Sequence, residues 1–390
     1  MTRWPVFADD ERAAAEQVLA SGRVNYWTGN EGRAFEEEFA AYTGARHAVA
    51  LANGTVALEL ALHALGVGPG DDVIVPARTF VGTATAVVAR GARPVVADVD
   101  RDSGNLTVAA IEAALTDRTR CVIPVHIGGW PCDMDEIMAF AEARGLFVIE
   151  DCAQAHGARW NGRHVGTFGH VGAFSFCQDK IMTTAGEGGM VITSDDDLWR
   201  RAWEYKDHGR SMAAMERAAA DGGYEFKWVA ESFGTNWRMT EVQAAVGRVQ
   251  IGKLDGWVET RRRNAAALDR GLAGVPGLRL VLPAVEALHA YYKYYAYLDL
   301  AALAPGWTRA RVLEEVNERG VACAQGVCSE IYRERAFTEA GWAPAGRLPV
   351  AAELGDSAIM LLVDPTLDEA DMTKAADVLR AVMTEATGGA

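Results

Sequence analysis

The chain has 390 residues, half of them hydrophobic, and its 38 basic and 53 acidic side chains give a formal net charge of -15. This length suffices for one large domain and a smaller one. The acidic balance disfavours nucleic acid as a partner, because no basic stripe neutralises phosphates. No apolar run approaches the roughly 20 residues of a membrane-spanning helix.

The N-terminal sequence MTRWPVFADDERAAAE has no apolar h-region, so we expect no signal peptide. The six cysteines are scattered without a CxxC pair, and no histidine cluster has the spacing of metal ligands. The sequence therefore predicts a reduced, cytoplasmic protein without a metal site.

The first 150 residues alternate helical and strand patterns. Helices are predicted over residues 9–21 and 33–42, with the loop-like segment NYWTGNEG between them. Apolar runs then predict strands over residues 47–52, 72–76, 94–100, 121–126 and 146–150. The helices between these strands follow Asn53-Gly54-Thr55 and cover residues 81–90, 108–115 and 134–144.

This alternation predicts an α/β fold with a mostly parallel sheet covered by helices on both faces. Ligands of such sheets bind at the carboxyl ends of the strands. We therefore expect five segments to meet at one rim, namely Asn53-Gly54-Thr55, Thr79-Phe80, His126, Asp151 and the loop that carries Lys180.

Residues 171–176 and 190–192 predict two further strands, which the Lys180 loop joins. A helix is predicted over residues 195–205. The polar segment KDHGRS follows, and then an Ala-rich stretch to about Gly223 that we expect to be a mobile surface excursion.

A long helix is predicted from Thr240, its N-cap, through Leu272. Beyond Pro276, short strand patterns and helices near residues 309–319 and 369–385 predict a small α+β domain. We divide the chain into a large domain, residues 1–250, and a connecting helix with the small domain, residues 251–390.

Four features of the predicted rim suit pyridoxal 5'-phosphate (PLP). Gly54 and Thr55 start a helix and offer backbone N–H groups and a hydroxyl to a phosphate. Asp151 follows a buried strand, so its carboxylate needs a cationic partner such as a pyridine nitrogen that carries a proton. Phe80 suits stacking on a flat ring, and Lys180 in a crowded site suits an amine nucleophile.

Each feature also has an ordinary structural explanation. Thr55 is then part of a plain helix start, Asp151 a helix cap, Phe80 a core aromatic and Lys180 a solvated loop lysine. The joint occurrence of the four in this order is what points to PLP.

Four segments carry a resemblance to a known family: ANGTVALELALHALGVGPGDDVIVPARTF, EDCAQAHGA, FSFCQDKIMTTAGEGGMVIT and NWRMTEVQAAVG. From about Ser21 to Asp371 the chain resembles the DegT/DnrJ/EryC1/StrS family of PLP-dependent sugar aminotransferases. The resemblance implies PLP fold type I, the aspartate aminotransferase-like architecture. That architecture has a large domain with a mostly parallel seven-stranded sheet flanked by helices, and a smaller C-terminal α+β domain.

The resemblance also implies roles for individual residues. The lysine that links to the cofactor falls on Lys180, and the carboxylate for the pyridine nitrogen falls on Asp151. Gln154 matches the residue that lies against the cofactor ring, and Phe80 the aromatic that stacks on it.

The phosphate site of the family falls on Gly54, Thr55 and Ser175. Asn236 matches an asparagine that reaches the phosphate from the other subunit, which implies a homodimer with shared active sites.

Transamination is implied because the 3-dehydratases of the family carry histidine in place of Lys180. The implied donor is L-glutamate or glutamine, and the implied acceptor is a nucleotide-linked 3- or 4-keto-6-deoxy sugar. Two departures lie near where acceptors bind in relatives. Gly128-Gly129 replaces an aromatic residue, and Asp364 in LLVDP replaces a histidine.

Candidate substrate residues are Trp27, Thr28, Tyr205, His208 and Lys293. A nucleotide diphosphate needs basic contacts, for which Lys206, Arg210, Arg238 and Lys293 are candidates unless each is a solvated charge.

Three alternatives stay open. The first is an aminotransferase for a cyclitol ketone or an aminobenzoate-type precursor. The second is a regulatory protein that keeps the PLP fold without turnover, against which the joint presence of Lys180, Asp151 and Gln154 argues. The third is a PLP lyase or desulfurase with a mobile catalytic cysteine, for which Cys152 and Cys177 are candidates only by proximity.

Overall fold

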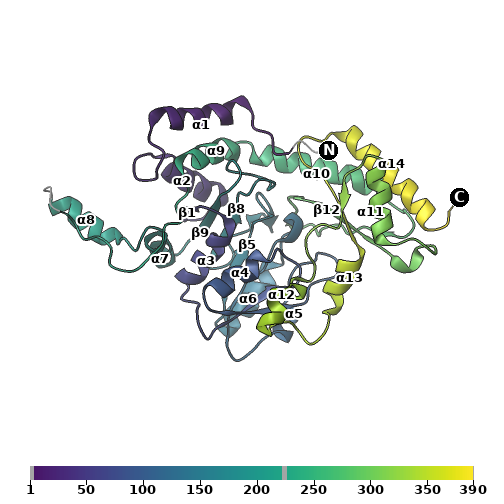
Figure 1. Ribbon diagram of the computed structural model, residues 1–390, viewed down its shortest axis with the longest axis horizontal. Helices are drawn as coiled ribbons and strands as arrows, with labels where there is room; N and C mark the ends of the chain where they lie inside the picture. The colour runs from purple at the N-terminus through teal and green to yellow at the C-terminus, as the bar shows by residue number, and fades with distance from the viewer. Residues whose placement is uncertain (1–3, 222–225, 390) are drawn as a thin grey trace.

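The computed structural model describes residues 4–221 and 226–389 (Figure 1). Its central element is a seven-stranded sheet with the order β1-β9-β8-β5-β4-β2-β3. The strands are β1 (His47–Leu51), β2 (Asp72–Pro76), β3 (Arg93–Ala97), β4 (Thr119–Val122), β5 (Phe147–Asp151), β8 (Val171–Ser175) and β9 (Gly189–Thr193).

The sheet is mostly parallel, as predicted. Strands β2, β3, β4, β5 and β8 pair in parallel, and β9 runs antiparallel to both of its neighbours, β1 and β8. The apolar runs in the sequence arise because strands such as β2 are buried on both faces of the sheet. Val73 and Val75 pack with helices α3 (Gly54–Ala64) and α4 (Gly82–Ala89). Ile74 between them packs with α5 (Val108–Ala113) and α6 (Met134–Arg144) on the other face.

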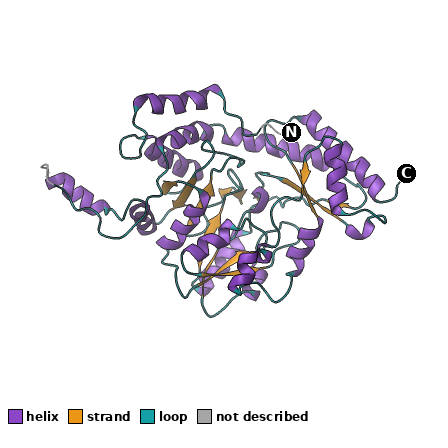
Figure 2. Ribbon diagram, in the orientation of Figure 1, coloured by secondary structure: helices purple, strands orange, loops and turns teal. Residues whose placement is uncertain are grey.

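Helices enclose this sheet (Figure 2). The helices of this part are α1 (Asp9–Ser21), α2 (Glu31–Thr43), α3 (Gly54–Ala64), α4 (Gly82–Ala89), α5 (Val108–Ala113), α6 (Met134–Arg144), α7 (Asp196–Lys206), α8 (Met212–Asp221) and α9 (Glu241–Ile251). A short 3-10 turn, η1 (Ile127–Gly129), follows β4. Each connection from a strand to its helix brings side chains to the rim at the strand's carboxyl end.

A second sheet of four antiparallel strands, in the order β10-β12-β14-β13, lies in the C-terminal part. Its elements are β10 (Leu278–Arg279), β12 (Tyr294–Leu298), β13 (Cys323–Ala324), β14 (Ala358–Leu361), α10 (Leu254–Leu272), α11 (Arg309–Glu318), α12 (Arg335–Ala340), α13 (Pro349–Ser357), α14 (Glu369–Ala386), η2 (Leu300–Ala302) and η3 (Ile331–Arg333). Helices α10, α11 and α14 share one hydrophobic core with this sheet. The division at residue 250 stays a prediction.

A small third sheet joins the two parts of the chain. Strand β6 (Arg159–Trp160) pairs with both β7 (Arg163–His164) and β11 (Ala287–Leu288). The segment after β11 therefore starts from a fixed point beside the large sheet.

One prediction about a helix was wrong, and one helix was not predicted. The long helix after Thr240 is two helices, α9 and α10, which are interrupted at residues 252–253 where Gly252 is a poor helix former. Residues 212–221 of the predicted surface excursion form a helix, α8, that projects from the body of the protein (Figure 1). The last residues of that predicted excursion lie outside the described residues. Among the described helices, none has the length and apolar character needed to cross a membrane.

Candidate active site

The start of α3 and the end of β8 form the first part of the site. Asn53 caps α3 by accepting a hydrogen bond from the Val56 N–H at 3.0 Å. The N–H groups of the first turn of a helix have no acceptor within the helix. A Cβ added to Gly54 would lie 2.5 Å from the Ser175 Cβ and 2.9 Å from its Oγ, so glycine permits this close approach. Backbone N–H groups, the Ser175 hydroxyl and the helix dipole therefore converge as a phosphate requires.

Phe80 and Thr55 both lie beside a second glycine, Gly82. A Cβ added to Gly82 would lie 2.9 Å from the Phe80 Cδ1 and 3.3 Å from the Thr55 Oγ1. The Phe80 side chain is 65% exposed, so it is not a core aromatic in the single chain. An exposed ring beside the start of α3 is available to stack on a flat ligand whose phosphate lies on that helix.

Asp151 ends β5 as a buried carboxylate. Its Oδ2 accepts a hydrogen bond from the Thr83 hydroxyl at 2.9 Å, and its Oδ1 accepts one from the Ala153 N–H at 3.1 Å. Burial raises the pKa of Asp151, although these two donors and the charge of Lys180 oppose the rise. A carboxylate in this state gains most from a cationic N–H partner, which is what a protonated pyridine nitrogen provides.

The Lys180 loop is held from three directions. The Trp4 Nε1–H donates to the Lys180 carbonyl oxygen at 2.9 Å, and the Lys180 Nζ lies 5.0 Å from the centroid of the Tyr292 ring. The neighbouring Asp179 accepts a hydrogen bond from the Tyr292 hydroxyl at 2.5 Å. Its Oδ2 also lies 3.7 Å from the Lys293 Nζ. Lys180 is half-buried and is not a freely solvated loop lysine.

Gln154 is buried and orients the loop after β4. Its Oε1 accepts a hydrogen bond from the Gly128 N–H at 2.8 Å. Gly129 has a φ of 94°, and a Cβ on it would lie 2.9 Å from the Tyr291 nitrogen. The Gly128-Gly129 pair therefore lets residues 290–293 dock against it, and this docking delivers Tyr292 to the Lys180 loop.

The other predicted site residues are not gathered around Lys180 within one chain. Tyr205 stacks on His63, with ring centroids 3.7 Å apart, near the far end of α3 from Thr55. Trp27 contacts Trp203 at 6.0 Å between centroids, and Thr28 lies beside it. His208 and Asn236 are exposed and lie on paired segments, since Asp207 and Asn236 form an isolated bridge.

Most of the basic residues proposed to contact a diphosphate also lie away from Lys180. Lys206 was expected to be solvated or to contact a diphosphate. Instead it is fully buried, with its Nζ 3.3 Å from a Glu36 carboxylate oxygen, because it forms an internal ion pair. Arg238 and Arg210 both face Asp207, at 2.5 and 3.7 Å. Of these four basic residues, Lys293 is the one beside the Lys180 loop.

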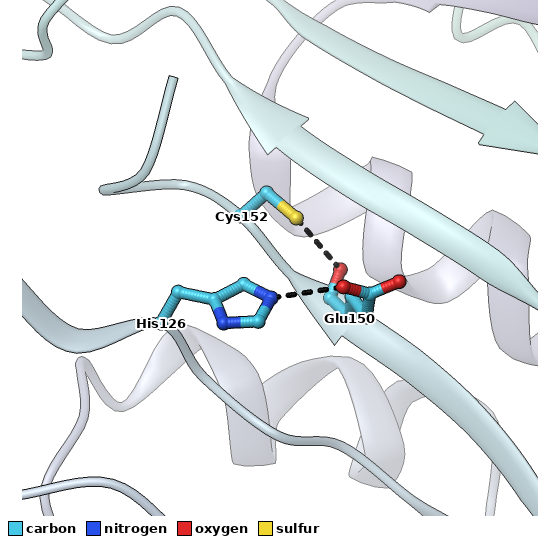
Figure 3. Close-up of side chains that lie close together, drawn as sticks. All are labelled: His126, Glu150 and Cys152. Atoms are coloured by element: carbon cyan, nitrogen blue, oxygen red, sulfur yellow. Dashed lines mark hydrogen bonds and ion pairs between the residues drawn. The ribbon is translucent and has the colours of Figure 1, made fainter. Parts of the chain in front are cut away.

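His126, Glu150 and Cys152 form the cluster closest to a metal site among the described residues (Figure 3). The His126 Nδ1 accepts the Cys132 N–H at 3.0 Å, so its Nε2 carries the proton and donates to Glu150 at 3.0 Å. Glu150 also accepts the N–H groups of Gly166, Phe168 and Gly169, each at 2.7 Å. The lone pairs of His126 Nδ1 and of the Glu150 carboxylate, which a metal ion would need, are thus already taken by N–H groups. The cluster instead stabilises the end of β5.

The two candidate cysteines lack the features of a reactive thiol. Burial raises the pKa of Cys152 well above its ordinary value, and its Sγ lies 3.7 Å from the Glu150 carbonyl oxygen. Burial also raises the pKa of Cys177. Both side chains therefore stay thiols at neutral pH, and this disfavours a lyase that needs a thiolate.

Glu150→Gln is expected to destabilise the protein by about 2–4 kcal/mol, because a side-chain amide brings N–H groups to a place where four donors already point. The free energy of unfolding in urea measures this effect. Glu112→Gln, which removes a surface ion pair with Arg144, is the matched control and is expected to change stability by about 0–1 kcal/mol. Equal stability of the two variants would contradict the bracing role.

Comparisons with known proteins find similarity over nearly the whole chain. The model of the DegT/DnrJ/EryC1/StrS aminotransferase family matches residues 5–380. The structure resembles that of an aminotransferase from Psychrobacter cryohalolentis, with 48% sequence identity, a TM-score of 0.96 and 99% of each chain covered.

Two relatives of named activity are similar along most of their length. UDP-N-acetyl-3-dehydro-alpha-D-glucosamine 3-aminotransferase of Acidithiobacillus ferrooxidans is 38% identical over 359 residues, which cover 92% of this chain and 90% of the relative. The dTDP-3-amino-3,4,6-trideoxy-alpha-D-glucose transaminase of Streptomyces venezuelae is 36% identical over 369 residues, which cover 94% and 90%.

Proposed function

Since the chain belongs to the DegT/DnrJ/EryC1/StrS aminotransferase family, we propose that it transfers an amino group from L-glutamate or glutamine to a nucleotide-linked 3- or 4-keto-6-deoxy sugar, with PLP as its cofactor. Such a product serves the synthesis of polysaccharides or secondary metabolites that contain amino sugars. The two relatives act, by their names, at the 3-position of UDP- and dTDP-linked sugars, which favours a 3-keto nucleotide sugar as the acceptor.

The observation that carries the proposal is the meeting of a phosphate site, an exposed ring and a buried carboxylate beside one lysine. Gly54, Thr55 and Ser175 suit the cofactor phosphate, and Phe80 suits its ring. Asp151 lacks a cationic hydrogen-bond partner among the described residues, so it fits the protonated pyridine nitrogen.

Bound PLP supplies an electron sink that is conjugated with the substrate nitrogen. With the cofactor in place, Lys180 would hold it through the Nζ, and the same amine would move the proton at the α-carbon of the donor. The Asp151 carboxylate would accept the N–H of the protonated pyridine nitrogen, and the Thr83 hydroxyl, which donates to Asp151, fixes the orientation of that carboxylate. The N-terminus of α3 would anchor the phosphate end of the cofactor, and Gln154 and Phe80 would lie against its ring.

The reaction has two halves, because the acceptor takes the amine only after the donor has left it on the enzyme. We therefore expect ping-pong kinetics. A panel of UDP- and dTDP-linked 3-keto and 4-keto sugars, with L-glutamate as donor and mass spectrometry of the products, tests the acceptor. Amination of a cyclitol ketone, with no amination of any nucleotide sugar, would replace this proposal by the alternative acceptor class.

The active enzyme is proposed to be a homodimer in which Asn236 of one chain reaches the cofactor phosphate of the other. Asn236 is exposed in the single chain, which leaves its amide available to a partner. Loss of a hydrogen bond to a charged phosphate is expected to weaken cofactor binding by about 10- to 100-fold in Asn236→Ala.

Co-expression tests this sharing directly. Hybrid dimers of the Lys180→Ala chain and the Asn236→Ala chain have one intact site in two. At limiting PLP, random pairing is expected to restore about a quarter of wild-type activity although neither variant alone is active. Activity that stays at the level of the separate variants would show that each chain supplies its own Asn236.

A further inference from the structure

Lys293 is brought to the Lys180 loop by a rigid piece of backbone. The Ala290 N–H donates to the Gly129 carbonyl oxygen at 2.9 Å, and the Lys293 N–H donates to that of Gly128 at 3.4 Å. The buried Arg261 donates from its Nη1 to the Tyr292 carbonyl oxygen at 3.2 Å. The position of the Lys293 backbone is therefore set by contacts on both of its sides.

The Lys293 ammonium shares its surroundings with the reactive lysine. Its Nζ lies 4.6 Å from the centroid of the Tyr292 ring, and the Lys180 Nζ lies 5.0 Å from the same centroid. Asp179 adjoins Lys180 in the chain and is the ion-pair partner of Lys293. One aromatic ring and one carboxylate thus link the two amines.

The ion pair of Lys293 is incomplete. The Lys293 Nζ and the Asp179 Oδ2 are 3.7 Å apart, which is too long for a hydrogen bond. The same oxygen accepts the Tyr292 hydroxyl at 2.5 Å. Burial lowers the pKa of Lys293, while the charges of Asp179 and Asp364 oppose this change. A half-buried ammonium with unfilled donor positions gains from a further anion.

This rests on the proposed function: we propose that the Lys293 ammonium binds the α-carboxylate of the amino donor. The donor's α-carbon must lie at Lys180, which moves its proton, and the α-carboxylate is bonded to that carbon. The diphosphate of a nucleotide sugar, in contrast, is attached at C1 and is separated by further ring atoms from the carbonyl carbon that reacts. A cation held next to Lys180 therefore matches the carboxylate of the donor and not the phosphates of the acceptor.

Asp364, which stands where the family commonly has a histidine, also acts on Lys293. Its carboxylate acts electrostatically on both Lys293 and Arg261. With Asp179, it offsets part of the positive charge that Lys180, Lys293 and Arg261 bring together.

The test compares Lys293→Met with the surface variant Lys374→Met in the holoenzyme, and each half-reaction is measured separately. The donor half-reaction is followed by cofactor absorbance with L-glutamate, and the acceptor half-reaction starts from the amine-loaded enzyme. For Lys293→Met, the donor KM is expected to rise about 10- to 100-fold, as for a lost charged hydrogen bond. The acceptor KM should stay within about twofold, and Lys374→Met should change neither KM.

Glutarate supplies a readout that needs no turnover. Its carboxylate should bind the wild-type holoenzyme in calorimetry with an affinity that Lys293→Met lowers by the same 10- to 100-fold. Lys293→Arg, which keeps the charge, should restore most of the donor KM. Should Lys293→Met not fold, Lys293→Gln provides the same comparison with a polar side chain of similar length.

Opposite outcomes separate this inference from the proposed function. A raised acceptor KM with an unchanged donor KM would assign Lys293 to the nucleotide phosphates, and two unchanged KM values would remove it from substrate binding. Either result overturns the inference and leaves the aminotransferase intact. If the wild-type enzyme takes no amine from L-glutamate or glutamine, the proposed function fails, and this inference fails with it.

Discussion

Lys180→Ala is expected to lower transamination by about 10⁴-fold or more, since it removes the amine that we propose both binds the cofactor and moves the proton. The variant should also lose the visible absorbance of the lysine-linked cofactor. Multiple-turnover assays with L-glutamate and a keto-sugar acceptor measure the first effect, and absorbance spectra of the purified protein measure the second.

The surroundings of Lys180 make this prediction specific. Its loop is fixed by Trp4, Asp179 and Tyr292 and not by the amine itself, so removal of the side chain should leave the fold unchanged. Lys374→Ala, on the outer face of α14, is the control and should keep full activity. A fully active Lys180→Ala protein would refute the assignment of this lysine.

The sheet was predictable because its strands are buried on both faces. Every residue of β2, β8 and β9 is buried, so apart from the terminal residues Asp72, Ser175 and Thr193 each strand is an apolar run in the sequence. The break between α9 and α10 was less visible, since a single Gly252 weakens a helix without forbidding it. Helix α8 was missed because most of its apolar side chains are alanines, and Met212 and Met215, which pack against the core, are too few to mark an apolar face in the sequence.

The candidate site was predictable only where local patterns determine it. Gly54 and Thr55 stand at a helix start and Asp151 at a strand end, and both positions follow from the strand–helix alternation. Trp4 and Tyr292 contact the Lys180 loop across 176 and 113 residues of sequence, and no local pattern announces such contacts. Thr83 could have been found, because it follows Thr79 by four residues at the same rim.

Buried charges were the least predictable part. Lys206 and Glu36 are 170 residues apart and form a pair inside the protein. Composition and spacing treat such a lysine as solvated, since unpaired lysine is rarely buried. Its partner, and with it its exclusion from substrate binding, becomes visible only when the distant segments are placed side by side.

Asp151→Ala is expected to slow proton removal from the donor by about 10³-fold while the protein still binds PLP. The reason is the role that we propose for the carboxylate, as the partner that keeps the pyridine nitrogen protonated. The phosphate contacts that we propose for Gly54, Thr55 and Ser175 do not involve the Asp151 carboxylate and should be unchanged in the variant. Single-turnover kinetics with L-glutamate measure the rate, and equilibrium dialysis measures the cofactor affinity.

Thr83→Val separates the charge of Asp151 from its orientation. Valine keeps the volume of threonine but removes the hydroxyl that donates to Oδ2 at 2.9 Å, so the carboxylate remains and loses one of its two fixed donors. We expect about a 10-fold loss of rate, as for one hydrogen bond to a charged group. A wild-type rate in Asp151→Ala would contradict the assigned role. A loss in Thr83→Val as large as in Asp151→Ala would show that orientation, and not charge alone, makes this carboxylate effective.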